Sequence, residues 1–185
     1  MSDIVWEIAN QQTIADLKIG EDEDLRFPVT RLRRGANLKP DFNEGEIALE
    51  FPENDETEIV YIIAQMPHSR VTNSDIEPHI HFRQNQANSP TFVMEYKWYN
   101  PNGDTIPTTW ETYVMDVPTN TSWTAGTISN MLYGSAPIDG NNKEKSSMML
   151  IKLYRQTGDG YSGDCLVDEF DIHYKNDKFG LDEPE

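Results

Sequence analysis

The sequence predicts an all-β protein, specifically a two-sheet antiparallel β-sandwich of the jelly-roll type. Apolar residues recur at every second position in several short stretches, which is the period of a strand with one buried face. Almost no stretch shows the apolar period of an amphipathic helix, about 3.6 residues, and "QQTIADLKIG" (11–20) could form one or two turns at most. About eight short strands without a helical layer are typical of two packed antiparallel sheets.

We expect three parts along the chain of 185 residues. These are an N-terminal arm over 1–23, a β-sandwich domain over 24–176 and a charged, acidic C-terminal tail over 177–185. The arm is polar, and Trp6 is its large aromatic anchor. Because an isolated tryptophan gains little unless a partner buries it, we predict that the arm reaches a neighbouring subunit.

The first predicted strands lie in "RFPVTRLR" (26–33) and "EIALEF" (46–51), which are short and alternating. The stretch "EIVYIIAQM" (58–66) is a nearly continuous apolar run rich in β-branched residues. Its length and composition predict a strand that is buried on both faces.

The next predicted strand is "IEPHIHFRQ" (76–84). Because successive side chains of a strand point to opposite faces, His79 and His81 should share the face opposite Ile80 and Phe82. The position of the two histidines on one face makes this strand the first place to look for a functional site.

Two further strands are predicted in "TFVMEYKWY" (91–99) and "TTWETYVMDV" (108–117). Residues 119–144 are rich in Gly, Ser and Asn, and we expect a long connection there. The last strands, "SMMLIKLYRQ" (147–156) and "CLVDEFDIHY" (165–174), are joined by a glycine-rich turn, so we predict an antiparallel hairpin.

The alternation in these strands also predicts which side chains form the core. A register error of one residue would move a side chain to the opposite face. The predicted core residues are Ile62, Ile80, Phe82, Met94, Tyr96, Trp98, Leu150, Leu153, Phe170 and Ile172.

The formal net charge of −17 argues against direct binding to nucleic acid, where basic side chains must replace counterions. Basic residues nevertheless gather in "RFPVTRLRRGANLK", which contains Arg31, Arg33 and Arg34. We expect these three arginines, together with Trp6, to bind a partner through complementary charge.

No apolar run approaches the about 20 residues that cross a bilayer, so we expect no membrane contact. The N-terminal stretch lacks the pattern of a secretory signal. The single cysteine, Cys165, excludes an internal disulfide framework and suits a reducing compartment, with a small buried apolar side chain as its expected role. These features predict a soluble cytosolic product, or one assembled in a cytosol.

His79 and His81 allow two interpretations. The closing strand should place Asp171 and His173 on one face, and if the two strands are neighbours, all four side chains could hold a zinc, iron or manganese ion. The glycines that flank the paired histidines of cupin motifs are absent from "IEPHIHFRQNQANS". We therefore expect histidines that pair with nearby carboxylates, which would raise the pKa of a histidine, and no bound metal.

Trp98, Trp110 and Trp123 offer a second alternative, an aromatic platform for sugars, although packing in a core or an interface is the commoner role of such residues. The alternative function is thus a cupin-like metal-binding enzyme or a carbohydrate-binding module. We expect instead a protein without enzyme activity, catalytic residues or cofactors.

Several segments resemble a group of virion structural proteins of tailed bacteriophages and their relatives in environmental viral sequences. The resemblance covers roughly residues 24–180, with Phe82 at a position where tryptophan is expected. The segments that carry it are "DLRFPVTRLRRG" (24–35), "AQMPHSR" (64–70), "IEPHIHF" (76–82), "MEYKWYNPNG" (94–103) and "LIKLYRQTGDGYSGDCLVDEFDIHYKND" (150–177).

This resemblance implies a β-sandwich attached to a virus particle, as a capsid decoration or cement protein or as a head- or tail-attached component. Its implied partners are other virion proteins, such as capsid, portal, collar or tail subunits, and further copies of itself. A homo-oligomer, for example a trimer, assembled in the host cytoplasm and located in the virion, is the expected state.

Overall fold

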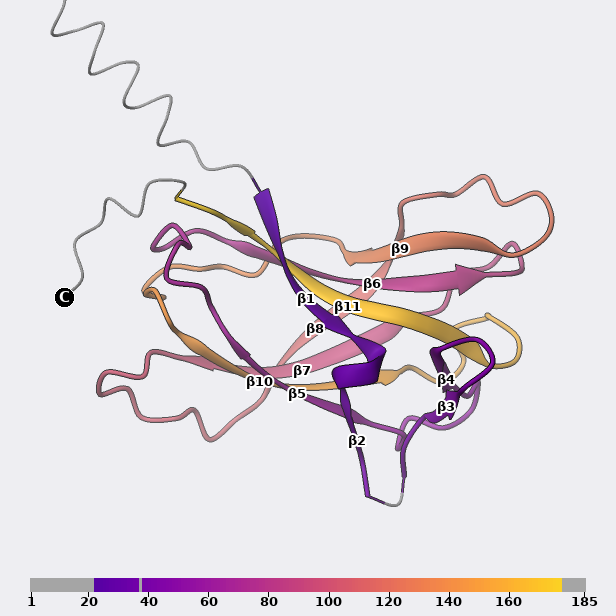
Figure 1. Ribbon diagram of the computed structural model, residues 1–185, viewed down its shortest axis with the longest axis horizontal. Coiled ribbons are helices and arrows are strands. Elements are labelled where there is room, and N and C mark those ends of the chain that lie inside the picture. The colour runs from indigo at the N-terminus through magenta and orange to yellow at the C-terminus, as the bar shows by residue number, and fades with distance from the viewer. Residues whose placement is uncertain (1–21, 37, 178–185) are drawn as a thin grey trace, which may run out of the picture.

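The computed structural model describes residues 22–36 and 38–177, and these ranges contain β-strands and one turn of 3-10 helix, η1 (Val29–Arg31), but no α-helix (Figure 1). The strands are β1 (Asp22–Pro28), β2 (Arg33–Arg34), β3 (Asp41–Asn43), β4 (Ala48–Phe51), β5 (Val60–Gln65), β6 (Ile76–Gln84), β7 (Phe92–Tyr99), β8 (Glu111–Pro118), β9 (Ile128–Gly134), β10 (Met148–Arg155) and β11 (Cys165–Lys175).

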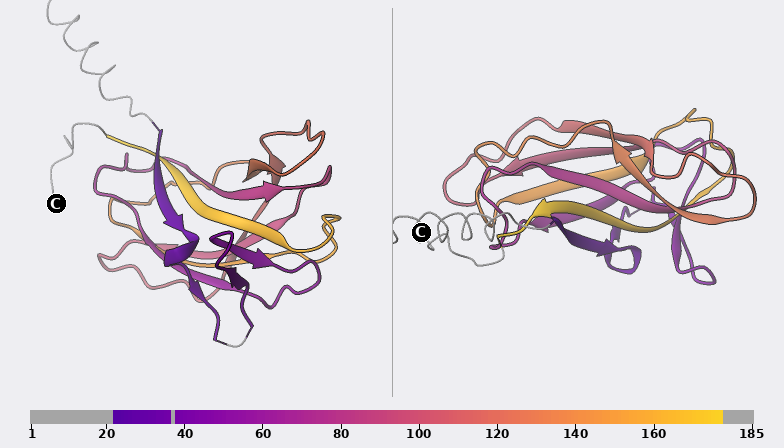
Figure 2. Two further views of the ribbon diagram at one scale, coloured as in Figure 1. Left: turned by 45° about the vertical axis from the view of Figure 1, so that its right-hand side comes forward. Right: turned by 90° about the horizontal axis from the view of Figure 1, so that it is seen from above.

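The strands form two facing layers that are parts of one continuous antiparallel sheet (Figures 1 and 2). One layer has the order β5-β10-β7-β8, and the other has the order β9-β6-β11-β4. The pairing of β8 with β9 joins the layers at one side, where the register shifts between Met115 and Val117. This order, with each layer built from strands far apart in the chain, is that of a jelly roll, and it confirms the predicted fold class.

The core lies between the layers and is built from the inward-facing positions of each strand. Among the predicted core residues, Ile62, Ile80, Phe82, Met94, Tyr96, Trp98, Leu153, Phe170 and Ile172 are all buried. The prediction that Leu150 belongs to the core is wrong. The burial of β10 alternates, and Met149, Ile151 and Leu153 are buried on the face opposite Leu150.

The prediction that 58–66 is buried on both faces is also wrong. In β5 the exposure alternates, and Tyr61 and Ile63 are 43% and 69% exposed. Within residues 22–36 and 38–177, the two residues of β2 pair with the free edge of β5, and no strand layer covers the face that carries Tyr61 and Ile63. The continuous apolar run therefore supplies both a core and an exposed surface.

The predicted hairpin of the last two strands is wrong as well. β10 pairs with β5 and β7, whereas β11 pairs with β1, β4 and β6 in the other layer. The connecting loop therefore crosses from one layer to the other. Its anchor is Arg155, which is buried and bonds Asp159 as well as the backbone carbonyls of Phe51, Tyr161 and Gly163.

A strand was missed within 119–144. β9 lies in this segment and pairs with β6 and β8, and it buries Leu132 at the core. Its buried positions are Asn130, Leu132 and Gly134, and only Leu132 is strongly apolar, so the alternation is weak in the sequence.

β1 and β4 share one edge of β11. β4 pairs with the first residues of β11, from Cys165 to Val167, and β1 pairs with the remainder as far as Lys175. β1 begins at Asp22, two residues before the expected start of the sandwich. Trp6 and most of the expected arm and tail lie outside the described ranges, and within those ranges no helix is long and apolar enough to span a bilayer.

Candidate functional site

The first candidate site is on the outer face of the layer that contains β6 and β11. These strands are neighbours, and their register places His79 opposite Asp171 and His81 opposite Glu169. The inward positions of the same strands hold core residues such as Ile80 and Phe170, so alternation directs the histidines and carboxylates outward.

The donor atoms of His79, His81 and Asp171 converge, which is the arrangement that the alternative of a metal site required of these residues. The two Nε2 atoms are 3.1 Å apart, and Asp171 Oδ2 is 3.2 Å from His81 Nε2 and 3.7 Å from His79 Nε2. All three donor atoms lie within 4.8 Å of one another. We call these residues the histidine cluster.

His173, the fourth predicted candidate, does not direct a nitrogen toward this point. Its Nε2 lies 2.7 Å from Asp24 Oδ1, and its Nδ1 lies 3.9 Å from Glu77 Oε2. The ring of His173 instead packs against His79, with 4.2 Å between the ring centroids. It therefore supports the cluster from the side.

Tyr133 of β9 also packs on the cluster. Its ring stacks on His79 with 4.7 Å between centroids and an interplanar angle of 16°. Together with its neighbours this leaves His79 only 1% exposed, whereas the side chain of His81 is 30% exposed. The cluster thus opens to solvent at His81.

The two histidines have opposite pKa shifts. Burial, followed by the nearby His173, lowers the pKa of His79 to about 4, so this ring is neutral at pH 7. The hydrogen bond with Asp171 raises the pKa of His81. The expected rise through carboxylate pairing is confirmed for His81 and wrong for His79, because the cost of charging a buried ring is larger.

The carboxylate of Asp171 is incompletely satisfied. Its side chain is 2% exposed, and its buried Oδ1 has no hydrogen-bond partner among the residues that the structure describes. Arg26 of β1 lies opposite Asp171 of β11, but its guanidinium bonds both carboxylate oxygens of Glu169. A buried carboxylate oxygen without a hydrogen-bond partner lowers the free energy of unfolding.

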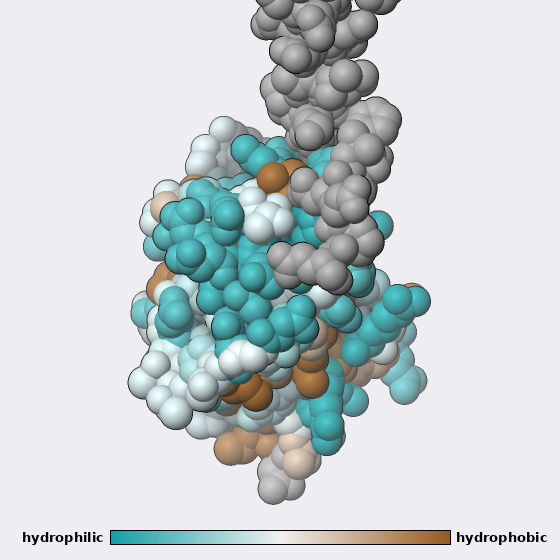
Figure 3. All heavy atoms as spheres, turned by 90° about the vertical axis from the view of Figure 1, so that its left-hand side faces the viewer, coloured by the Kyte–Doolittle hydropathy of each residue, from teal (hydrophilic) through white to brown (hydrophobic). Residues whose placement is uncertain are grey.

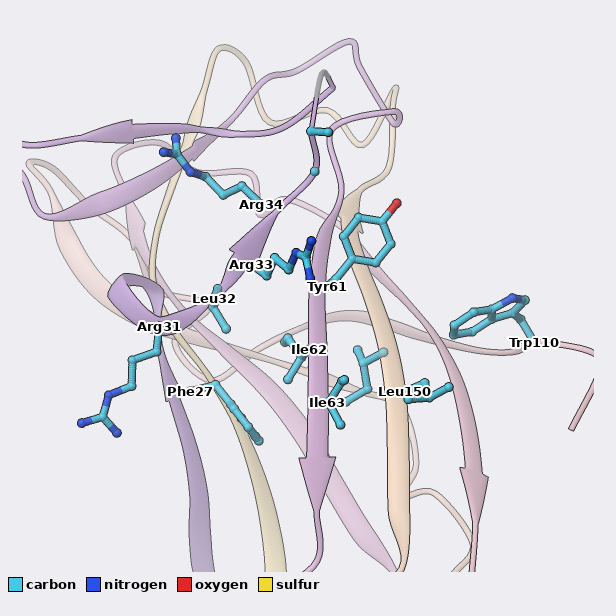
Figure 4. Close-up of a pocket in the computed structure, with 13 residues that line it drawn as sticks. Phe27, Arg31, Leu32, Arg33, Arg34, Tyr61, Ile62, Ile63, Trp110 and Leu150 are labelled. Atoms are coloured by element: carbon cyan, nitrogen blue, oxygen red, sulfur yellow. The ribbon is translucent and has the colours of Figure 1, made fainter. Parts of the chain in front are cut away.

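The second candidate site is a groove of about 750 Å³ on the exposed face of β5 and β10 (Figure 4). Its apolar lining includes Tyr61, Ile63 and Leu150 of the exposed face, the buried Ile62 and Ile151, and Phe27, Leu32 and Trp110. In Figure 3 the hydrophobic residues gather along the lower part of the molecule, the side on which β5 and β10 lie in Figure 1. We call this feature the β5–β10 groove.

The three arginines predicted to bind a partner, Arg31, Arg33 and Arg34, all line this groove. Figure 4 shows Arg33 beside Tyr61, whereas Arg31 turns away from the apolar lining. Arg34 donates a hydrogen bond to the carbonyl of Pro40 at 3.3 Å. The groove therefore combines an apolar floor with a basic rim, and sequence reasoning found the rim but missed the floor.

The three tryptophans of the proposed sugar platform lie in different surroundings. Trp98 is 3% exposed and donates a hydrogen bond to Ser147 Oγ, so it cannot stack on a sugar. Trp110 lines the groove, with Lys152 Nζ 4.1 Å from its ring centroid. Trp123 donates a hydrogen bond to the carbonyl of Gly126.

Cys165 is fully buried, which raises the pKa of its thiol and suits the packing role expected for it.

Comparison with known proteins gives no family: no family model matches the chain, and no curated protein matches it. One similar solved structure is the CBM36-1 domain of a multidomain xylanase from the hindgut metagenome of Trinervitermes trinervoides, at 10% identity and a TM-score of 0.35, covering 82% of this chain and 96% of that one. Another is Eiger TNF from S. frugiperda, at 10% identity and a TM-score of 0.31, covering 90% and 96%. Both similarities are distant, and the fold assignment rests on the strand order itself.

Proposed function

We propose that this chain is a non-enzymatic structural protein of a tailed-bacteriophage virion, a decoration, cement, or head- or tail-attached component that binds neighbouring subunits through the β5–β10 groove. The sequence resemblance over 24–180 supports the virion role. The β5–β10 groove supports the binding role. The observation that carries this role is that an exposed apolar floor lies beside the basic rim, which the sequence predicts to bind a partner.

Exposed apolar residues on β5 are the energetic reason to expect an occupant. Ile63 is 69% exposed and Tyr61 is 43% exposed, side by side with Leu150 in the groove lining. Full burial of a side chain of this size stabilises a complex by about 1.5–3 kcal/mol before the cost of association. Apolar groups gathered at one place, with a polar rim, are typical of a protein interface.

The proposed occupant is the segment 1–21 of a second copy of this chain. This segment carries Trp6 and other apolar residues, and Asp3 and Glu7 flank the tryptophan. An aromatic anchor suits the apolar floor, and the adjacent acids suit the arginine rim. In a repeating array, many such modest contacts act together, so each one can be weak.

The virion role is tested on purified particles of the virus that encodes the chain. We expect mass spectrometry to detect the protein at many copies per particle, and a cryo-EM map to show its sandwich at a repeated position. A particle preparation that lacks the protein while infected cells contain it would contradict the proposal.

A further inference from the structure

The geometry of the histidine cluster departs from the expectation that no metal is bound. A metal held by imidazole nitrogens at about 2.0–2.1 Å keeps its ligand atoms about 3.3 Å apart in a tetrahedral site and about 2.9 Å apart in an octahedral one. The observed separations between the donor atoms of His79, His81 and Asp171 are 3.1, 3.2 and 3.7 Å. From this arrangement we propose that the histidine cluster binds a divalent first-row transition metal, with zinc as the ion to test.

Charge and burial support this assignment. The carboxylate of Asp171 is buried, its Oδ1 is unpartnered among the described residues, and the neighbouring guanidinium of Arg26 is engaged by Glu169. A divalent cation would neutralise the carboxylate and accept the lone pairs of two imidazoles that now face each other.

The ligand types select the class of ion. Two imidazoles and one carboxylate suit zinc, iron or manganese, whereas magnesium and calcium prefer oxygen ligands alone. Tyr133 and His173 both pack on His79 and hold its ring in place, as supporting residues do around metal ligands. The exposed side of His81 leaves a coordination position open to water.

A bound ion would cross-link two neighbouring strands of the fold. His79 and His81 belong to β6, and Asp171 belongs to β11, so one ion would join adjacent strands on the outer face of their layer. This site is in a different layer from β5 and β10, and its test does not depend on the proposed function.

The test uses the full-length protein without an affinity tag, treated with chelator, dialysed, and titrated with zinc chloride by calorimetry. We expect one zinc per chain, and a rise in unfolding temperature when zinc is added, because the ion binds the folded state. His81→Gln and Asp171→Asn should each weaken zinc binding by more than about tenfold, since loss of a supporting residue alone costs that much. Magnesium at the same concentration should not compete.

The matched control is His68→Gln, the same change at an exposed histidine that contacts Ser146 Oγ. It should bind zinc as the wild type does. Wild-type protein without saturable one-to-one binding, or equal binding by His81→Gln and His68→Gln, would overturn the proposal. If the cluster variants do not fold, cobalt(II) bound to the wild type decides: a visible spectrum unlike that of aqueous cobalt supports the site, and an aqueous spectrum overturns it.

Discussion

Asp171 of β11 lies directly opposite His79 of β6, and its Oδ2 lies 3.7 Å from His79 Nε2 and 3.2 Å from His81 Nε2. Two histidines of one strand thus share one carboxylate of the next strand. The jelly-roll order creates this contact, because it places the last strand of the sandwich beside β6.

This sharing predicts energetic coupling between His81 and Asp171. In a double-mutant cycle of His81→Ala and Asp171→Ala, measured by urea unfolding in the presence of chelator, we expect a coupling free energy of about 0.5–3 kcal/mol. A control cycle of His81→Ala with the exposed Asp116→Ala should be additive within about 0.5 kcal/mol. Additivity in the first cycle would show that the two side chains do not interact.

The buried pair of Arg155 and Asp159 predicts a second stability effect. Both side chains are fully buried, and their Nε and Oδ2 atoms are 2.8 Å apart. Asp159→Asn would leave a buried guanidinium uncompensated, which should cost about 3–5 kcal/mol of unfolding free energy at pH 7. Asp116→Asn, at an exposed position, should change it by less than about 0.5 kcal/mol.

The same pair predicts a pH dependence with a definite sign. Burial alone would raise the pKa of Asp159, but hydrogen bonds from Arg155 and from the backbone N–H groups of Thr91 and Tyr161 lower it. A lowered folded-state pKa stabilises above the unfolded value, about 3.9, and this contribution is lost as the pH falls through the folded value. Urea unfolding should therefore show the difference between wild type and Asp159→Asn narrowing below about pH 4. A difference that stays constant from pH 7 to pH 3 would contradict this assignment.

Gly140 should not tolerate a side chain. A Cβ at this position would lie 1.8 Å from the backbone carbonyl oxygen of Ser74, which cannot move without shifting the chain. We expect Gly140→Ala to lower the free energy of unfolding by about 1–3 kcal/mol. At Gly45 the nearest atom would be 3.4 Å away, at the end of the Asn43 side chain, so Gly45→Ala is the control and should be nearly neutral. Equal effects of the two changes in thermal unfolding would refute the steric argument.

The fold class and the faces of β6 and β11 could be predicted from the sequence, because strict alternation decides which side chains share a face. His79, His81 and Asp171 could therefore be named together. The distances between the donor atoms of these residues could not be predicted, because they depend on which strands are neighbours. The glycine-rich loop from Arg155 to Gly163 resembled a hairpin turn in the sequence. In the structure it connects the two layers, and the buried side chain of Arg155 holds it by bonding Asp159 and the carbonyl of Gly163.

The β5–β10 groove could not be predicted because a continuous apolar run does not say which of its faces is covered. Ile62 and Ile63 are alike in the sequence, but only the first meets the opposite layer. The nearby arginines were the available signal, since charge at one edge indicated a contact with a partner.

The basic rim predicts salt-sensitive self-association. Arg33→Glu should weaken association of the full-length protein in sedimentation equilibrium, and added sodium chloride should weaken it in the wild type, because exposed charges are screened within about 8–10 Å at physiological salt. Lys175→Glu, an exposed change at the end of β11, is the control and should leave association unchanged. Association that is indifferent to both salt and Arg33→Glu would remove the arginines from the interface.

The most direct test of the proposed docking is sedimentation velocity of the full-length chain over a range of concentrations. We predict that the wild type associates, that Ile63→Asp abolishes association, and that excess free peptide of residues 1–21 dissociates the wild-type oligomer. Ile106→Asp, at a residue that is 49% exposed and outside the groove lining, should behave as the wild type does. A wild type that remains monomeric at every concentration, or an Ile63→Asp variant that associates as strongly as the wild type, would contradict the account.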